Sequence, residues 1–352
     1  MTSTNIISEI CHKATQTSQL SNAEILALVN AHNEDDQLIF ATANQIRMNN
    51  VGSDIHLRGL IEFSNICIRE CQYCGLYCRN KKIKRYRMPI DDIIATAESA
   101  HKIGYQSIVL QSGEDPFYNS NRLAEVISKI KSKLDIAITL SAGEFTYDEY
   151  KTLKQAGVNR YLLRFETSDP QLYRQLHPDS QLDERLECLK YLKALDFEVG
   201  TGFMVGLPNE TPQIFANNLE LLQKLDVDMI GIGPFVANPD TPLKEASSGT
   251  VQNGLKAVAI TRMLMPTANI PATTAMGTLD PQGREKALNA GANVIMPNVS
   301  PMKFRELYQL YPGKMCITSD QGRIIAEQMI KDIGRTVAQT QGHSLKFRSK
   351  HG

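Results

Sequence analysis

The sequence lacks an excess of charge of either sign: Lys and Arg together number 38, and so do Asp and Glu. Proteins that bind nucleic acid or an anionic membrane through their overall field usually carry a basic excess. We therefore expect no nucleic acid and no membrane among the partners, and a small molecule instead.

Long apolar runs are also missing. No stretch approaches the roughly 18 consecutive apolar residues of a membrane span, and the opening MTSTNIISEICHKATQT lacks the basic start and apolar run of a secretory signal. Nor does a linker, a low-complexity segment or an internal repeat divide the chain. Its 352 residues, 42 % apolar and 22 % charged, predict a cytoplasmic globular protein with one large domain or two.

Cysteine is scarce, with seven residues in the whole chain. The odd number and the wide scatter of Cys11, Cys188 and Cys316 fit reduced thiols better than a disulfide framework. The other four stand within twelve residues, in CIRECQYCGLYC from Cys67 to Cys78. This grouping indicates that they share one task.

The chain is predicted to begin with helices and to continue as alternating strands and helices. SNAE, residues 21–24, is a capping-box pattern, and the acidic residues 34–36 suit the start of a second helix that ends near Asn49. From Arg58 onward, runs rich in Ile, Val, Leu and Phe alternate with amphipathic patterns, several of which end at a glycine. The expected strands cover residues 58–64, 107–112, 136–141, 160–166, 198–205, 229–233, 270–275 and 292–297.

Eight alternating units predict an α/β protein with a closed (β/α)8 barrel of the TIM type, and an open doubly wound sheet is the alternative. We expect residues 1–50 to form a helical extension, 51–318 the barrel, and 319–352 a C-terminal helix and tail that pack on it. In such barrels the catalytic groups lie at the C-terminal ends of the strands. The cysteine group directly follows the first expected strand.

Three interpretations of the cysteine group compete. Buried structural thiols are disfavoured because polar and charged residues stand between the cysteines. A zinc site usually joins two C-x2–4-C knuckles across a spacer, whereas here one segment would supply every ligand. The third interpretation is an iron–sulfur cluster, in which Cys67, Cys71 and Cys74 hold three corners of a 4Fe–4S cube.

The spacing C-x3-C-x2-C differs from the ferredoxin run, whose fourth cysteine precedes a proline. Three thiolates leave one iron without a protein ligand, free to chelate a small molecule and to pass it an electron. Cys78 is either an ordinary thiol or a fourth ligand that would remove the open iron.

The three-cysteine motif, with Tyr73 before its last cysteine, resembles that of the radical S-adenosylmethionine (radical SAM) enzymes. Longer strings over about residues 50–316 resemble the HydE family of FeFe-hydrogenase maturases. These strings include HLRGLIEFSNIC, KRYRM, VLQSGEDP, RYLLRFET, FMVGLPNET, DMIGIGPF, IPATTAMGT, GANVIMPN and YQLYPGK. The resemblance implies an enzyme that uses one 4Fe–4S cluster and S-adenosylmethionine to generate a 5′-deoxyadenosyl radical during hydrogenase cofactor assembly.

The resemblance also assigns residues to S-adenosylmethionine. Glu114 of SGED stands at the family's acidic position for the amino group, and Glu166 and Arg185 resemble contacts to ribose and carboxylate. From the residues alone, Glu114 would be a helix N-terminal carboxylate and Arg185 a surface residue. The remaining expected cofactor contacts are Tyr73 in the three-cysteine motif, Gly202 and Gly206 on a strand near the adenine, and Met229 as the apolar cover of the adenine, which could equally be core.

The substrate implied by the resemblance is a small sulfur- or cysteine-bearing or organometallic iron precursor. Its expected binding residues lie at strand ends or in YQLYP and suit anionic groups, although paired threonines could simply be β-branched strand residues. These residues are Arg58, Gln111, Arg164, Thr273, Thr274, Met296 and Tyr311.

Two departures from the resemblance stand out. Phe165 replaces the histidine expected in RHET, so a possible imidazole proton donor is missing. Cys316 stands without a neighbouring cysteine, so we expect one cluster and no auxiliary cluster.

The resemblance implies other hydrogenase maturation proteins as partners, and an electron donor of the flavodoxin or ferredoxin type. The basic run KKIKRYR, residues 81–87, is a solvated surface or a docking site for such a donor. The alternatives are a mutase like methylornithine synthase and a non-catalytic iron–sulfur carrier or scaffold. Biotin synthase is less expected because its auxiliary cluster needs further cysteines in the barrel.

Overall fold

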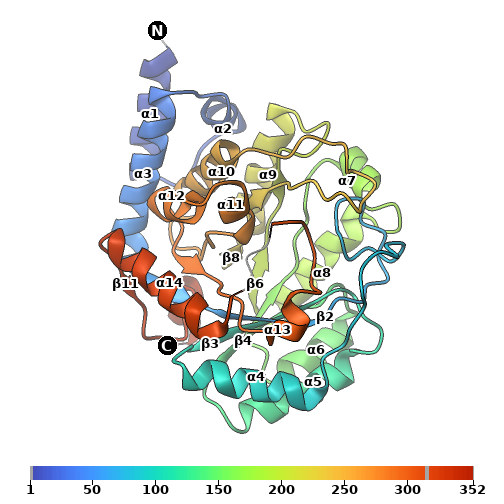
Figure 1. Ribbon diagram of the computed structural model, residues 1–352. Coiled ribbons are helices and arrows are strands. Elements are labelled where there is room, and N and C mark those ends of the chain that lie inside the picture. The colour runs from blue at the N-terminus through green and yellow to red at the C-terminus, as the bar shows by residue number, and fades with distance from the viewer. Residues whose placement is uncertain (1–2, 314–316, 352) are drawn as a thin grey trace.

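The computed structural model describes residues 3–313 and 317–351, and Figure 1 shows a barrel of strands surrounded by helices. Cys316, expected to stand alone, lies outside the described residues. Six parallel strands form the main sheet in the order β2, β3, β4, β5, β6, β8. Their bounds are β2 Gly59–Ser64, β3 Ser107–Ser112, β4 Ala137–Ser141, β5 Arg160–Leu162, β6 Glu198–Thr201 and β8 Met229–Ile230.

The ring is closed by short parallel contacts on the far side of this sheet. Met229 bridges to Asn269, Pro271 bridges to Val294, and Leu60 bridges to Asn298. Strand β1 (Asp54–Leu57), which leads into β2, pairs in parallel with β10 (Val294–Ile295). The eight expected strand positions therefore form one closed barrel, which confirms the TIM-type fold, and the open-sheet alternative is wrong.

Several expected strands end earlier than the sequence indicates. The run 270–275 makes only isolated bridges, because α11 (Thr274–Leu279) begins inside it with Thr273 as its N-cap. The run 198–205 splits into β6 and β7 (Met204–Val205), and β7 pairs with β9 (Gly233–Pro234) in a separate small sheet. Apolar composition predicted these runs, but pairing with a neighbour decides where a strand ends.

Helices cover the outside of the barrel, as parallel strands buried on both faces require; all six residues of β2 are buried. Glycines with positive φ angles follow three of these helices: Gly104 at 100°, Gly157 at 106° and Gly291 at 119°. The helix bounds are α4 Ile90–Lys102, α5 Ser120–Lys131, α6 Tyr147–Gln155, α7 Pro170–Leu176, α8 Leu182–Ala194, α9 Pro212–Leu225, α10 Val251–Leu264, α12 Gly283–Asn289 and α13 Met302–Arg305.

The N-terminal helices α1 (Ser3–Gln16), α2 (Asn22–Val29) and α3 (Glu34–Val51) lie along one side of the barrel, in blue in Figure 1. The expected capping box of α2 is formed, since Ser21 and Glu24 exchange side-chain to main-chain hydrogen bonds. Helix α3 packs against α10, where Lys256 and Asp36 form a buried ion pair at 3.2 Å. Whether 1–50 behaves as a separate extension stays a prediction.

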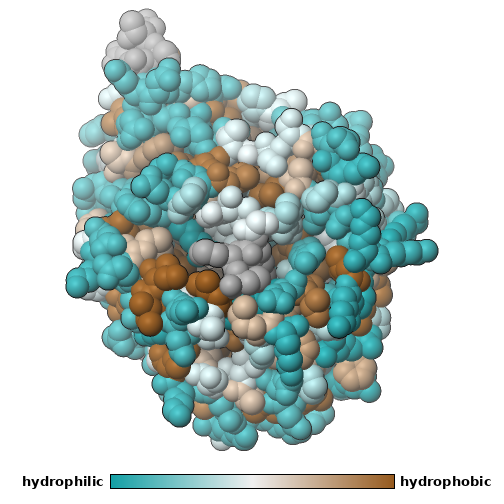
Figure 2. Space-filling view, in the orientation of Figure 1, coloured by the Kyte–Doolittle hydropathy of each residue, from teal (hydrophilic) through white to brown (hydrophobic). Residues whose placement is uncertain are grey.

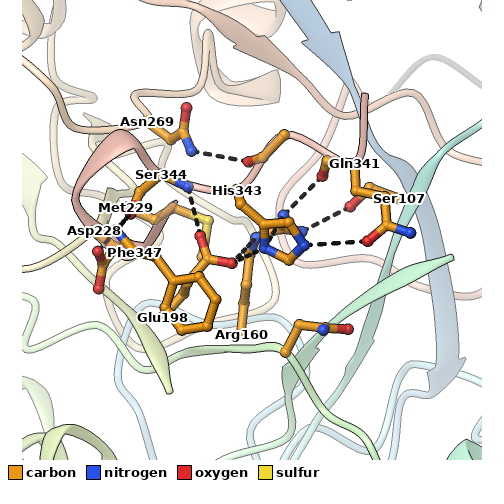
Figure 3. Close-up of polar contacts among 12 residues, drawn as sticks. Ser107, Arg160, Glu198, Asp228, Met229, Asn269, Gln341, His343, Ser344 and Phe347 are labelled. Atoms are coloured by element: carbon orange, nitrogen blue, oxygen red, sulfur yellow. Dashed lines mark hydrogen bonds and ion pairs between the residues drawn. The ribbon is translucent and has the colours of Figure 1, made fainter. Parts of the chain in front are cut away.

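The C-terminal segment, with α14 (Ser319–Asp332), β11 (Thr336–Val337) and α15 (Leu345–His351), returns to the N-terminal end of the barrel. Strand β11 pairs with β1, and residues 341–344 lie over the starts of β5 and β6. Figure 3 shows the contacts: Arg160 donates to the Gln341 carbonyl at 2.7 Å, and the Ser344 N–H donates to Glu198 at 2.7 Å. The tail thus covers the end of the barrel opposite the cysteine group.

No helix in the described ranges is long and apolar enough to cross a membrane. Figure 2 shows a mainly hydrophilic face on which apolar atoms gather over α14, where Ile324 and Ile325 are exposed.

Candidate functional site

The cysteine loop, residues 65–80, follows β2 at the C-terminal end of the barrel. Cys67, Cys71 and Cys74 are half-buried free thiols, whereas the Cys78 thiol is exposed. The loop passes close to the end of β3, where a Cβ atom on Gly113 would stand 2.7 Å from the Cys67 Cβ. Glycine at position 113 therefore lets the loop lie against the barrel mouth.

The donor set fits an iron–sulfur cluster. The N–H groups of Arg69 and Leu76 donate to the sulfurs of Cys67 and Cys74, each at 3.4 Å. Burial raises the pKa of Cys67, Cys71 and Cys74, the last to about 12, so thiolates here need compensation by bound metal.

The same group of cysteines does not suit zinc. Across residues 3–313 and 317–351, no three His, Cys, Asp or Glu side chains are grouped to hold a single metal ion, as a zinc site requires. A 4Fe–4S cluster instead presents separate irons, three of which would each take one of these thiolates. The fit is therefore to a cluster with three protein ligands.

A chain of ion pairs joins the cysteine loop to the loops after β3 and β4 and to helix α8. Arg69 Nε lies 2.6 Å from Glu114 Oε2, and Arg69 Nη2 lies 2.6 Å from Glu144 Oε2. Glu144 Oε1 in turn lies 2.5 Å from Arg185 Nε. Burial raises the pKa of Glu114, although the neighbouring Arg69 and Arg185 oppose this shift. Alternating charges of this kind suit the amine and carboxylate of an amino acid end.

Glu166 is held in a strained conformation beside this chain. Its φ angle is 66°, and the N–H groups of Phe165 and Glu166 donate to the Gly202 carbonyl at 3.0 and 3.1 Å. Gly202 is required there because a Cβ atom would overlap the Gly231 carbonyl. Tyr73 is half-buried nearby, and burial and the charge of Glu166 raise its pKa.

Gly206 continues the same barrel edge, again with a positive φ angle, 75°. A Cβ atom there would overlap the Gly249 backbone, so the two segments pass in direct contact. The Gly206 N–H donates to Glu210 Oε2 at 2.6 Å, and burial raises the pKa of Glu210 to about 7. Glu210 thus fixes the turn that presents Gly206.

The lumen holds several buried donors without acceptors. In the described part of the chain, Arg164 Nε, Arg284 Nε and Thr273 Oγ1 have no hydrogen-bond partner, while Arg164 Nη2 forms an ion pair with Glu166 Oε2 at 2.8 Å. Arg284 Nη2 lies 3.3 Å from Thr274 Oγ1. Burial raises the pKa of Tyr311 to about 12, against the opposing charge of Arg284. Buried hydrogen-bond donors without partners that lie close together suit the binding of an anionic group.

Other predicted residues lie elsewhere in the lumen. Gln111 donates to the Tyr308 hydroxyl at 3.3 Å, and Met296 is half-buried just after β10. Arg58 and Met229 lie at the opposite end of the barrel from the cysteine loop, where Arg58 Nη1 contacts Met229 Sδ at 2.7 Å. The structure thus places Arg58 apart from the expected substrate residues, and Met229 apart from the expected adenine contacts.

Phe165 faces away from the lumen. It is fully buried and stacks on Phe203, with ring centroids 5.9 Å apart, in the layer between strands and helices. Arg164 and Phe165 follow the end of β5, and they point to different neighbours: a Cβ atom on Gly231 would lie 3.8 Å from Arg164 Cδ, whereas Phe165 packs on Phe203. A histidine at this position would point to the same core.

Sequence reasoning missed Arg69, Glu144, Glu210 and Arg284. Glu144 could have been found, because SAGE after β4 repeats the strand-end pattern of SGED after β3. Arg284 carried no such signal, since it reaches the lumen from the start of α12.

Comparisons with known proteins agree with this geometry. Residues 61–222 match the radical SAM superfamily. The [FeFe] hydrogenase maturase subunit HydE of Thermotoga maritima is 48 % identical over 302 residues, which are 85 % of this chain and 86 % of that protein. A 3-methylornithine synthase of Methanosarcina acetivorans is 28 % identical over 79 % of each chain.

Two solved structures are similar over most of the chain. A methylornithine synthase has a TM-score of 0.85 and 25 % identity, covering 97 % of this chain and 99 % of that one. HydG, a maturase of the [FeFe]-hydrogenase, has a TM-score of 0.83 and 20 % identity, covering 96 % and 77 %. The HydG likeness supports the fold alone.

Proposed function

Since the chain belongs to the HydE family of the radical SAM superfamily, and so cleaves S-adenosylmethionine with a 4Fe–4S cluster, we propose that it matures FeFe hydrogenase. Its substrate would be a small sulfur- or cysteine-bearing or organometallic iron precursor. The observation that carries this proposal is the position of three half-buried cysteines in one loop, with Cys78 exposed, above a lumen that holds buried donors without hydrogen-bond partners.

Each group of residues has a separate task in this proposal. Cys67, Cys71 and Cys74 hold the cluster, which when bound supplies one electron to split S-adenosylmethionine into methionine and a 5′-deoxyadenosyl radical. Glu114 and Arg185, within the ion-pair chain, orient the amino acid end of the cofactor. The barrel walls keep water from the reacting centre.

The lumen donors would bind the anionic part of the substrate. Arg164 and Arg284 supply two guanidinium groups, and Thr273 supplies a hydroxyl without an acceptor. Tyr311 stays protonated at neutral pH because its pKa is about 12, so its phenol donates as well. Carboxylate or cyanide-like groups are the acceptors that such donors suit.

The test is activation of a hydrogenase. The full chain, reconstituted anaerobically with iron and sulfide and reduced with dithionite, should release 5′-deoxyadenosine from S-adenosylmethionine. Added to the other maturation proteins and apo-hydrogenase, it should restore hydrogen evolution. Cofactor cleavage without hydrogen evolution would refute the maturase role. Rearrangement of added lysine would favour a mutase like methylornithine synthase, and a reduced cluster without cleavage would favour a carrier.

Removing the lumen charge of Arg284 should impair substrate use. We expect Arg284→Gln to lower hydrogenase activation by about 10- to 100-fold, since a hydrogen bond to a charged group contributes about 1.5–3 kcal/mol. Iron content should stay at the parent level because Arg284 does not contact the cysteine loop. Arg174→Gln, which removes an exposed arginine on α7, is the matched control. Parent-like activation by Arg284→Gln would exclude a role for it in substrate binding.

We further propose that the protein works in the cytoplasm with other maturation proteins and a donor of the flavodoxin or ferredoxin type. Exposed Lys81, Lys82 and Lys84, close in sequence to the cysteine loop, suit an acidic donor surface.

A further inference from the structure

Arg85 belongs to the basic run 81–87, but its side chain is turned inward. Lys81, Lys82 and Lys84 are exposed, whereas Arg85 is half-buried. Tyr86 beside it is buried, and Ser64 of β2 bridges to Arg87, so the run returns along the strand that leads into the cysteine loop. Arg85 thus stands directly beneath that loop.

The Arg85 guanidinium donates to four main-chain carbonyls of the cysteine loop. Nη1 donates to Asn65 O at 2.6 Å and to Leu76 O at 2.9 Å. Nη2 donates to Tyr77 O at 2.7 Å and to Asn80 O at 3.1 Å. The first carbonyl precedes the first cysteine ligand and the other three follow the last one. One planar side chain therefore links the start of the cysteine loop to its end through hydrogen bonds.

Arg85 also carries its charge close to the sulfurs. Arg85 Nη1 donates to the Leu76 carbonyl at 2.9 Å, and the N–H of Leu76 donates to Cys74 Sγ at 3.4 Å. One residue therefore separates the guanidinium from a ligand sulfur, so its charge can act on charge that develops there.

This charge is not neutralised by a carboxylate. Arg69 and Arg185, the other guanidinium groups near the cysteines, both form ion pairs with Glu144. Within the described ranges no carboxylate lies within 4.0 Å of Arg85, which meets only carbonyl oxygens. Its field at the sulfurs is therefore less compensated than that of the other two.

We propose that Arg85 is a positioning residue for the iron–sulfur cluster: it ties the cysteine loop together through four carbonyls and, by its unpaired charge, makes the cluster easier to reduce. A cluster with three thiolate ligands gains negative charge when it takes up an electron, so a nearby cation favours the reduced state. This inference requires the cluster of the proposed function but not its substrate.

The test uses the reconstituted full chain as parent, Arg85→Gln, Arg85→Lys and the control Lys84→Gln, which removes a charge from the exposed neighbouring position. Iron per chain is measured first. The ratio of reduced to oxidised cluster is then measured by electron paramagnetic resonance at one fixed solution potential. Neither readout depends on turnover.

We expect Arg85→Gln to lower the iron content at least twofold and the reduced-to-oxidised ratio about tenfold, equivalent to about 59 mV for a one-electron couple. Arg85→Lys should restore the ratio but not the iron content, because an ammonium group cannot span four carbonyls. Lys84→Gln should match the parent in both.

If Arg85→Gln has the same reduced-to-oxidised ratio as the parent, the proposed effect of charge is wrong. If Arg85→Lys has the same iron content as the parent, the proposed role of the four carbonyl hydrogen bonds is wrong. If Arg85→Gln does not fold, as judged by circular dichroism, the iron content of Arg85→Lys decides. A parent chain that binds the cluster but activates no hydrogenase would refute the proposed function and leave this test unaffected.

Discussion

Cys71→Ser should abolish cluster formation and reduce 5′-deoxyadenosine release by at least about a hundredfold, because a serine hydroxyl is not a thiolate ligand of comparable strength. Cys71 is the middle of the three ligands and its pKa is raised well above the ordinary value by burial and by Cys74 and Cys67. Bound iron would stabilise thiolates so placed. Iron content and chromatographic measurement of 5′-deoxyadenosine provide the two readouts.

Cys78→Ser is the matched control for that loss. Its thiol is exposed, and its main-chain N–H donates to the Arg69 carbonyl at 2.9 Å, a bond that serine keeps. We expect iron content and 5′-deoxyadenosine release within about twofold of the parent. Loss of both in Cys78→Ser would instead make Cys78 a fourth ligand and remove the open iron from the proposal.

Glu198→Ala should lower the free energy of unfolding by about 3–5 kcal/mol, because it leaves a buried guanidinium without its counter-charge. Arg160 Nε lies 3.2 Å from Glu198 Oε1, and both side chains are at most 1 % exposed. Figure 3 shows that Glu198 also binds the C-terminal segment, through hydrogen bonds with the His343 side chain and the Ser344 N–H. Urea unfolding of the full chain, followed by circular dichroism, measures the loss.

The same carboxylate predicts a dependence on pH. Burial alone would raise the pKa of Glu198, but Arg160 and His343 lower it to about 2, against about 4.3 in an unfolded chain. Because the pKa is lower in the folded state, ionised Glu198 stabilises the fold above about pH 4.3. This contribution to the free energy of unfolding, about 3 kcal/mol in all, is lost as the pH falls towards 2. Glu198→Gln should remove this portion of the acid sensitivity.

Glu187→Ala serves as the control for Glu198. It removes a carboxylate that is 45 % exposed and paired with Lys190 at 2.8 Å on the helix surface. Such pairs contribute little, so we expect a change of less than about 0.5 kcal/mol. Equal small effects at both positions would show that the buried pair does not anchor the tail.

Much of the fold was predictable because it depends on local patterns. The capping box at Ser21 and Glu24 and the positive φ angles of Gly104 and Gly157 are properties of a few neighbouring residues. The alternation of apolar strand and amphipathic helix likewise predicted a parallel barrel. Strand lengths were not predictable, since α11 begins at Thr274 where the sequence alone suggests a strand.

The candidate site was predictable only in part. The three cysteines of C-x3-C-x2-C lie within one loop, so their closeness in the sequence also makes them close in the structure. Glu144 and Arg69, by contrast, are 75 residues apart, and only the parallel order of β2, β3 and β4 places their loops side by side.

The sequence by itself determined the family and the order of strands and helices, and it predicted the three thiol ligands, because each depends on short, contiguous patterns. The tertiary structure alone decided which charged groups meet. Arg69 forms ion pairs with Glu114 and Glu144, Arg85 meets carbonyl oxygens and no carboxylate among residues 3–313 and 317–351, and Arg58 lies far from the cysteines. Pairing of side chains depends on distances across the barrel, and those distances exist only once the ring has closed.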